Sequence, residues 1–185
     1  MCRLLAFAFN NDTDREEKIS CINSFKKLAI TGGVLDRSSP GHADGWGITV
    51  YQEKNTIPFL YKSARSAAED IDGISESFLS EKKYESGLAH LRKQTVGEVS
   101  LLNAHPFVEG HFSFIHNGTI GKDKDTYPEL SSFCNGSTDS ERVFRRFLEL
   151  HKNKPLSVLS SFIKMIEETK ELYPTYSAIN TKCFS

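Results

Sequence analysis

The chain has 185 residues, of which 38% are hydrophobic and 25% are charged, a composition that excludes a disordered, collagen-like or coiled-coil protein. Lys and Arg number 23 against 24 Asp and Glu, so the sequence offers no strongly basic surface to nucleic acid or an anionic membrane. No apolar run approaches the roughly 20 residues of a membrane span, and the first residues do not have the pattern of a secretory signal. We therefore expect a cytoplasmic protein that binds neither nucleic acid nor membrane.

The cysteines and histidines do not have the spacing of a metal site. No Cys-x-x-Cys pair exists, and the cysteines are scattered at Cys2, Cys21, Cys134 and Cys183. The histidines that a hydrolytic metal could use, at His90, His105, His111 and His116, match no known ligand spacing. We assign the chain no metal and no cofactor.

The first half of the chain predicts strands grouped around one helix. Residues 2–9 form an apolar run long enough for a buried strand. A helix is expected from Asp14 to Ile30, because Thr13 and Glu16 have capping-box spacing. Residues 31–45, rich in Gly, Ser, Asp and Pro, indicate a long loop. Strands are then expected at residues 46–52 and 57–62, with residues 53–56 as the turn between them.

The second half predicts further strands and two more helices. A short helix is expected at residues 68–80, and strands at 86–91 and 111–115. Thr138 and Glu141 again have capping-box spacing before an amphipathic helix.

The end of the chain predicts one more helix and one more strand. Pro155 suits the first position of the last helix. Its expected inward residues are Leu156, Leu159, Phe162, Ile163 and Ile166. With a final strand at residues 176–184, the order of elements indicates a layered α+β domain.

Cys2 is unusual because it directly follows the initiator methionine. A free cysteine at the start of a strand is most often a small buried hydrophobe. If Met1 is removed, however, Cys2 carries a thiol and a free α-amino group on one residue. That amine, with an ordinary pKa of about 7.7–8.0, is a base beside a nucleophile.

Four further motifs each have a structural interpretation, and three of them also have a chemical one. The glycines of HADGWG (residues 42–47) shape a turn before a strand. Arg92 in AHLRKQT follows an apolar strand, where it either forms a surface ion pair or grips a carboxylate. Asn117–Gly118 is either a type I′ hairpin turn or a pair of oxyanion donors. Asp139 in STDSE either favours a helix start or holds an ammonium group.

Taken together and in this order, the motifs are specific enough to indicate a protein family. A Met-Cys start followed by HADGWG, HLRKQT, NAHP, HNG and TDSE resembles the class II glutamine amidotransferases, of the N-terminal nucleophile hydrolase superfamily. The similarity is greatest to their short, stand-alone members and runs from Cys2 to about Phe147. It implies a single glutamine amidotransferase type 2 domain over residues 1–185, folded as a four-layer αββα sandwich with the nucleophile on the first strand.

The resemblance also implies a role for each matching residue. Cys2 becomes the N-terminal nucleophile, and the oxyanion hole is formed by the Asn117 side-chain amide and the Gly118 N–H group. Arg92 matches the arginine that holds the substrate α-carboxylate, and Asp139 matches the acid that binds the α-ammonium.

Two substrate-binding positions and two departures from the family pattern complete the comparison. Thr95 matches a substrate-contact threonine, and His105 lines the same region without a chemical step. Lys93 and Gln94 replace hydrophobic residues often found after the arginine, which changes the expected pocket rim. Members of the family also usually continue beyond this chain's last residue, so we expect either a C-terminally truncated domain that lacks its last strands or a fold that closes differently.

The function implied is hydrolysis of the glutamine side-chain amide, through a Cys2 thioester, to glutamate and ammonia. The expected partners are an ammonia-accepting synthase subunit or a second copy of the chain in a homo-oligomer. One alternative keeps the site and changes the substrate to a γ-glutamyl amide or peptide, because Arg92 and Asp139 would grip the same glutamyl end. Another is an inactive regulatory or binding subunit.

Overall fold

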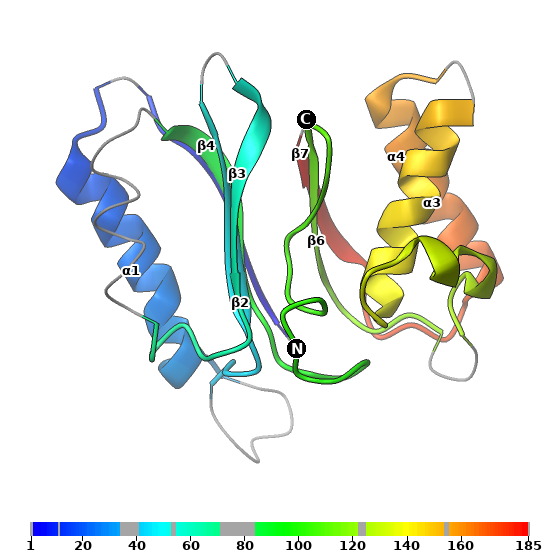
Figure 1. The fold of residues 1–185 in the computed structure, drawn as a ribbon, viewed down its shortest axis with the longest axis horizontal. Coiled ribbons are helices and arrows are strands. Elements are labelled where there is room, and N and C mark those ends of the chain that lie inside the picture. Colours follow the sequence, from blue (N-terminus) through cyan, green and yellow to red (C-terminus); the bar gives the residue numbers. More distant parts are fainter. Residues whose placement is uncertain are drawn as a thin grey trace.

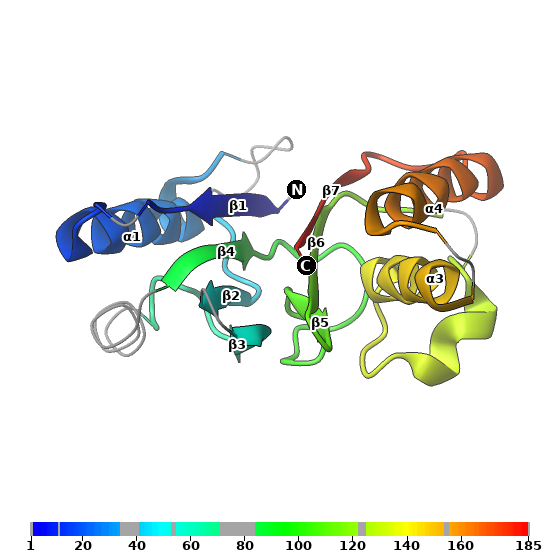
Figure 2. The same cartoon turned by 90° about the horizontal axis from the view of Figure 1, so that it is seen from above.

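The fold consists of two antiparallel sheets packed face to face between two layers of helix. The computed structural model describes residues 2–10, 12–33, 41–52, 55–70, 84–121, 125–153 and 156–184. Helix α1 covers the outer face of one sheet, and α3 and α4 cover the outer face of the other (Figure 1). The view from above shows the same succession of layers (Figure 2). The α+β, αββα sandwich expected from the sequence is confirmed.

The first sheet has the strand order β1-β4-β2-β3. Its strands are β1 (Arg3–Ala8), β2 (Trp46–Gln52), β3 (Asn55–Ser63) and β4 (Tyr84–Leu91). Strands β1 and β4 are antiparallel, with Arg3 opposite Leu91. The start of β1 therefore lies beside the end of β4, which brings Cys2 close to the residues that follow Leu91.

The second sheet has the order β5-β6-β7. Its strands are β5 (Phe107–Glu109), β6 (Phe112–Asn117) and β7 (Asn180–Phe184). The strands predicted at residues 111–115 and 176–184 thus exist with shifted bounds, while β5 was not predicted. Asn117 ends β6 opposite Asn180 of β7, so Asn117–Gly118 does not form the hairpin turn that was one interpretation of the motif.

Helix α1 (Arg15–Thr31) packs on the first sheet. Its N-cap is Asp14, whose side chain accepts a hydrogen bond from the Glu17 backbone N–H at 2.8 Å. The predicted Thr13 cap is wrong by one residue, because the Thr13 hydroxyl instead donates to Asn10. The core on this side includes Trp46, which is only 1% exposed.

The opposite layer contains a short 3-10 helix, η1, and two α-helices, with bounds η1 (Pro128–Phe133), α3 (Asp139–Asn153) and α4 (Val158–Leu172). At the start of α3, Thr138 Oγ1 accepts from the Glu141 N–H at 3.2 Å, as its spacing predicted. The Glu141 carboxylate, however, does not reach back to Thr138. It accepts the backbone N–H groups of Asn135 and Gly136 instead.

Helix α4 begins later, and faces the core differently, than the sequence suggested. Its N-cap is Ser157 and its first residue is Val158, and the predicted first position, Pro155, lies outside the described residues. Of the expected inward residues, Phe162 and Ile166 pack against the core, whereas Leu159 and Ile163 are 67% and 46% exposed. The buried positions are Ser161, Met165 and Thr169, and Thr169 donates to the Met165 carbonyl and bonds the Tyr127 hydroxyl within the core.

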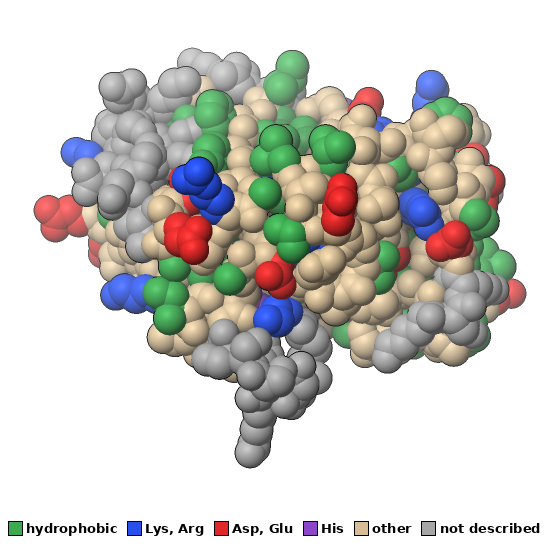
Figure 3. Space-filling view, turned by 60° about the horizontal axis from the view of Figure 1, so that its bottom comes forward, with side chains coloured by type: hydrophobic (Ala, Val, Ile, Leu, Met, Phe, Trp, Pro, Cys, Tyr) green, Lys and Arg blue, Asp and Glu red, His purple; other side chains and the backbone are tan. Residues whose placement is uncertain are grey.

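The remaining features concern the surface. Of the helix predicted at residues 68–80, positions 71–80 lie outside the described residues, and residues 67–69 form a turn. Acidic and basic side chains are interspersed on the face shown in Figure 3, where hydrophobic side chains also reach the surface. Among the helices of the described ranges, none combines the length and apolarity needed to span a bilayer.

Candidate active site

The predicted site residues come from four different elements whose ends meet between the sheets. Cys2 precedes β1, Arg92 follows β4, Asn117 ends β6 and Asp139 begins α3. The amino-terminal end of the traced chain lies in the space between the two sheets (Figure 1). Residues far apart in the sequence are therefore held on one framework of strand ends.

Cys2 contacts both sheets. Its backbone nitrogen donates to the side-chain oxygen of Asn117 at 2.8 Å. Its sulfur lies 3.3 Å from the Lys93 backbone nitrogen and 3.4 Å from the Lys93 carbonyl oxygen. The thiol therefore lies against the main chain of the residue that directly follows Arg92. No sequence pattern indicates this backbone contact, because every residue type except proline can make it through its main chain.

Burial raises the pKa of the Cys2 thiol above its ordinary value. The hydrogen bond from the Lys93 backbone and the nearby Arg92 guanidinium act in the opposite direction, but burial has the larger effect. The thiol is thus protonated near neutral pH. A reaction at this sulfur needs a base close by.

At the Asn117–Gly118 corner, a hydrogen bond orients the Asn117 side chain and a positive φ constrains the Gly118 backbone. Since Asn117 Oδ1 accepts the Cys2 N–H, the other end of the same amide, Nδ2, is directed away from that nitrogen. Gly118 has a φ of 154°, and a β-carbon there would collide with the Ala178 carbonyl. Glycine is therefore required at this corner. The arrangement leaves the Asn117 amide nitrogen as a donor on the residue that accepts the Cys2 N–H.

Arg92 is buried but forms no surface ion pair. Its Nη1 donates to the Glu98 carbonyl at 2.9 Å, and its Nη2 donates to the Val96 carbonyl at 2.8 Å. Burial lowers the pKa of Arg92, while the nearby Cys2, Asp44 and Asp139 oppose this shift; an arginine still stays charged in such a setting. No described carboxylate lies within ion-pair distance of the guanidinium. Its charge is therefore free to attract an anion from outside.

The HADGWG motif holds the backbone around Arg92. The Arg92 N–H donates to the Gly45 carbonyl at 2.8 Å, and the Asp44 N–H donates to the Arg92 carbonyl at 3.1 Å. The Asp44 carboxylate also accepts the Gln94 N–H at 2.8 Å. The motif thus fixes the segment against which the Cys2 sulfur lies, a role that sequence analysis did not assign to Asp44.

Asp139 is buried at the first turn of α3. Its Oδ2 accepts the Ile120 N–H at 2.7 Å, and its Oδ1 accepts the Ser140 N–H at 2.9 Å. The Ser140 hydroxyl lies 2.8 Å from Nδ1 of His116. Burial lowers the pKa of His116, although the Asp139 charge acts against this. This neutral histidine therefore links the Asn117 strand to the start of α3.

The last two predicted site residues occupy different surroundings. Thr95 is exposed, and its hydroxyl accepts a hydrogen bond from Thr119 at 3.0 Å, so it lies near the Gly118 corner. His105 is buried, with its ring stacked on His90 at 4.2 Å and close to Phe107. Neither ring nitrogen of His105 has a hydrogen-bond partner. This burial gives no support to substrate contact by His105.

The described residues contain no group of three or more His, Cys, Asp and Glu side chains placed to hold a metal ion. The polar groups around Cys2 are instead one amide, one guanidinium and one carboxylate. Such a set suits a small organic molecule that carries both signs of charge.

Comparison with known proteins identifies relatives that match most of the chain. A candidate glutamine amidotransferase of Haemophilus influenzae is 31% identical over 157 residues, covering 83% of this chain and 49% of that protein. The glutamine–fructose-6-phosphate aminotransferase (isomerizing) of Bacillus spizizenii is 29% identical over 173 residues, covering 82% of this chain and 26% of that protein. The chain therefore spans half or less of the length of these relatives.

A solved structure and a family-wide comparison complete the assignment. The glutamine phosphoribosylpyrophosphate amidotransferase of Bacillus subtilis superposes with a TM-score of 0.58 at 12% identity, covering 89% of this chain and 32% of that one. At that identity the likeness shows the fold alone. The sequence pattern of the family described as class II glutamine amidotransferases matches residues 1–181. The chain belongs to the class II glutamine amidotransferase family.

Proposed function

We propose that this chain hydrolyses the side-chain amide of glutamine to glutamate and ammonia, with Cys2 as an N-terminal nucleophile. The observation that carries the proposal is the hydrogen bond of 2.8 Å between the Cys2 nitrogen and Asn117 Oδ1. It supports a nucleophile and a base that both belong to Cys2 and are hydrogen-bonded to the residue that supplies the oxyanion donor, Asn117.

The base is the α-amine of Cys2 once Met1 has been removed. Removal converts the Cys2 amide nitrogen into an amine, which can still donate to Asn117 Oδ1. The unperturbed pKa of such an amine is about 7.7–8.0, so a large fraction is neutral near pH 7.5. A neutral amine can accept the proton of a thiol whose pKa burial has raised.

In the first half-reaction, the Cys2 sulfur forms a bond to the amide carbon as its proton moves to the α-amine. The carbonyl oxygen becomes an oxyanion, which the Asn117 Nδ2–H and Gly118 N–H groups bind. As the carbon–nitrogen bond breaks, the α-ammonium returns the proton to the leaving nitrogen. The products are free ammonia and a γ-glutamyl thioester on Cys2.

In the second half-reaction, water replaces the sulfur. The α-amine takes a proton from the water as its oxygen adds to the thioester carbon, and the same two donors bind the second oxyanion. The carbon–sulfur bond then breaks, the thiolate regains the proton, and glutamate is released. No redox change and no further reactant are needed.

Recognition of the substrate falls to Arg92 and Asp139. The Arg92 guanidinium binds the α-carboxylate, since it is buried without a carboxylate partner among the described residues. The Asp139 carboxylate binds the α-ammonium while it accepts the Ile120 N–H. Opposite charges on a rigid frame select a zwitterionic amino acid.

The ammonia is passed to an acceptor enzyme. Support comes from the Bacillus spizizenii aminotransferase, in which the matching region is about a quarter of a much longer protein. The acceptor would be another part of a longer protein or a separate subunit.

The direct test is a glutamate assay on the purified chain with glutamine, alongside a γ-glutamyl dipeptide. We expect glutamate from glutamine, and a roughly 10- to 100-fold higher KM for Arg92→Lys and Asp139→Asn, because each loses a charged hydrogen bond. Faster cleavage of the dipeptide than of glutamine would assign the site to γ-glutamyl peptides. No turnover of either substrate by a chain with Cys2 as its first residue would contradict the proposal.

A further inference from the structure

One buried asparagine bonds two loops of the proposed substrate site. One loop contacts the Arg92 guanidinium, and the other leads into Asp139. Asn103 is 1% exposed and lies in the segment between β4 and β5. Its side chain bonds both the loop that receives the Arg92 guanidinium and the loop that leads into Asp139. This asparagine is the first residue of the NAHP motif, whose pattern predicts no role for it.

The first loop contacts Arg92 directly. The Glu98 carbonyl accepts Arg92 Nη1 at 2.9 Å and Asn103 Nδ2 at 3.0 Å. Arginine and asparagine therefore share one acceptor. Arg92 has a second bond, from Nη2 to the Val96 carbonyl, which does not involve Asn103. Asn103 thus controls where the Glu98 end of this loop lies, and Arg92 itself keeps an independent anchor.

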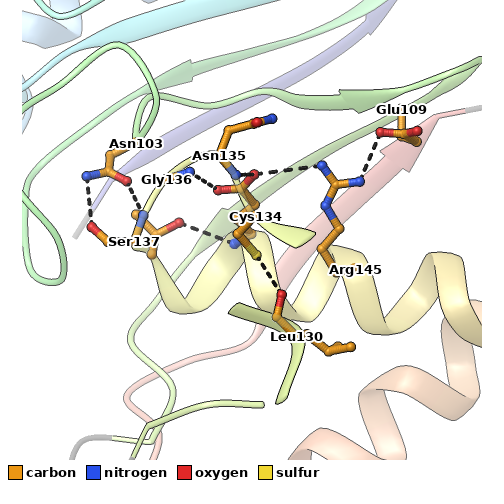
Figure 4. A network of polar contacts seen from close by, with 10 residues as sticks. Asn103, Glu109, Leu130, Cys134, Asn135, Gly136, Ser137 and Arg145 are labelled. Carbon is orange, nitrogen blue, oxygen red and sulfur yellow. Dashed lines mark hydrogen bonds and ion pairs between the residues drawn. The ribbon is translucent and has the colours of Figure 1, made fainter. Parts of the chain in front are cut away.

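The second loop leads into α3. Asn103 Oδ1 accepts the Ser137 N–H at 2.8 Å, and Asn103 Nδ2 lies 3.2 Å from the Ser137 hydroxyl. Ser137 is two residues before Asp139. Figure 4 shows Asn103 and Ser137 joined by these two contacts, with Asn135 and Gly136 next along the same loop. Asn103 therefore fixes the approach to Asp139.

The second loop is also held from its other side. The Glu141 carboxylate accepts the Asn135 and Gly136 N–H groups at 2.8 Å each. A β-carbon on Gly136 would collide with Asn103 Oδ1. The loop is therefore held between Asn103 and Glu141 by hydrogen bonds from both sides.

We propose that Asn103 is a specificity-determining positioning residue that sets the spacing between Arg92 and Asp139. The inference rests on the proposed function, in which these two residues bind the α-carboxylate and the α-ammonium. An amide suits this position, because one side chain donates to the Glu98 carbonyl and accepts from the Ser137 N–H. A substrate with both charges on one carbon fits only when the two loops hold Arg92 and Asp139 at the matching separation.

The test compares glutamine with glutaramate, which has the same carboxylate and amide but no α-ammonium. Asn103→Leu removes all the bonds, and Asn103→Asp keeps the acceptor for the Ser137 N–H while it loses the donor to Glu98. For Asn103→Leu we expect kcat/KM for glutamine to fall by about 10- to 100-fold, mainly through KM, and for Asn103→Asp, which keeps the Ser137 N–H bond, we expect a smaller fall in the same direction. The value for glutaramate should stay within about threefold, since Arg92 keeps its bond to Val96.

Two further variants make the outcome specific. If Asn103 acts through Asp139, then Asn103→Leu has no further effect on glutamine in an Asp139→Asn background. Ser113→Ala is the control. Ser113, near the start of β6, is also buried, and it is hydrogen-bonded to the hydroxyls of Thr49 and Tyr51. It should lower the unfolding temperature without changing the preference for glutamine. Asn103→Asp keeps the test available if Asn103→Leu does not fold.

The possible failures can be told apart. If the unaltered chain does not hydrolyse glutamine, or if Asp139→Asn leaves its preference over glutaramate unchanged, the proposed function is wrong. If those two results hold but the Asn103 variants lose both substrates equally, or lose neither, only the positioning role is overturned.

Discussion

The backbone nitrogen of Cys2 and the side-chain oxygen of Asn117 are 2.8 Å apart, although 115 residues separate them in the chain. This contact joins the start of one sheet to the end of a strand in the other. It also orients the Asn117 amide, because an oxygen that accepts from Cys2 leaves the nitrogen of the same amide directed elsewhere. A single hydrogen bond thereby aligns the proposed base with the proposed oxyanion donor.

Substitution of Asn117 should separate these two roles. Asn117→Ala removes both, and Asn117→Asp keeps an acceptor for the Cys2 nitrogen while it removes the donor to the oxyanion. We expect both variants to lower kcat by about 10²–10³-fold with a smaller change in KM, which is the usual cost of losing one oxyanion donor. Near-normal kcat in Asn117→Asp would show that Asn117 serves only to hold Cys2.

Cys2→Ala should abolish glutamate formation. The acyl-enzyme mass, measured on the intact protein after mixing with glutamine, should also be absent. Cys21→Ala is the matched control, because Cys21 is likewise a free, half-buried cysteine but lies in α1. Cys21→Ala should retain both the activity and the acyl-enzyme. Loss of activity in both variants, or in neither, would contradict the assignment of the nucleophile.

The buried histidines should make the fold sensitive to acid. Burial lowers the pKa of His90 to about 3 and lowers the pKa of His105 well below its ordinary value. Between about pH 6.5 and those values, only the unfolded chain binds the two protons. The free energy of unfolding should therefore fall as pH falls below about 6.5, by about 1.4 kcal/mol per pH unit for each histidine.

The acid effect can be measured as the unfolding temperature from pH 7.5 to pH 5. His105→Phe should make the decrease smaller, since it removes one such group and its ring replaces an imidazole whose nitrogens have no partners. An unfolding temperature that is constant over this range, or that rises toward pH 5, would be the opposite of the expected sign.

Helix α4 offers a test of which face is buried. Met165 is fully buried, whereas Leu159 is 67% exposed. Met165→Ala should lower the free energy of unfolding by about 2–5 kcal/mol, and Leu159→Lys should change it by less than about 0.5 kcal/mol. Urea unfolding measures both, provided that the denaturant slope is unchanged. Equal losses would mean that Leu159 is covered by another part of the protein or by a partner.

Much of the fold could be predicted because it depends on local pattern. The alternation and bounding turn residues located β2 at Trp46–Gln52 without error, and capping spacing located the start of α3 at Thr138. Local pattern could not orient α4, because apolar residues lie on two neighbouring stripes of that helix. The buried stripe includes Thr169, which bonds the hydroxyl of Tyr127, a residue distant in sequence.

The candidate site could be predicted residue by residue, but its geometry could not. Arg92 was expected either to form a surface ion pair or to grip the carboxylate of a ligand. Its guanidinium donates to loop carbonyls four to six residues further along the chain. The bond between Asn103 and Ser137 spans 34 residues and leaves no periodic signal. Such contacts depend on how the sheets place their loops, which is a property of the folded chain.

The most direct measurement is the identity of the first residue and the glutaminase rate, both determined on one sample. Mass spectrometry separates chains that begin at Met1 from chains that begin at Cys2, and a coupled assay follows glutamate. The account predicts that the rate is proportional to the fraction beginning at Cys2 and is zero when Met1 is retained. Full glutaminase activity in a chain that keeps Met1 would contradict it, because the α-amine of Cys2 would then be blocked as an amide.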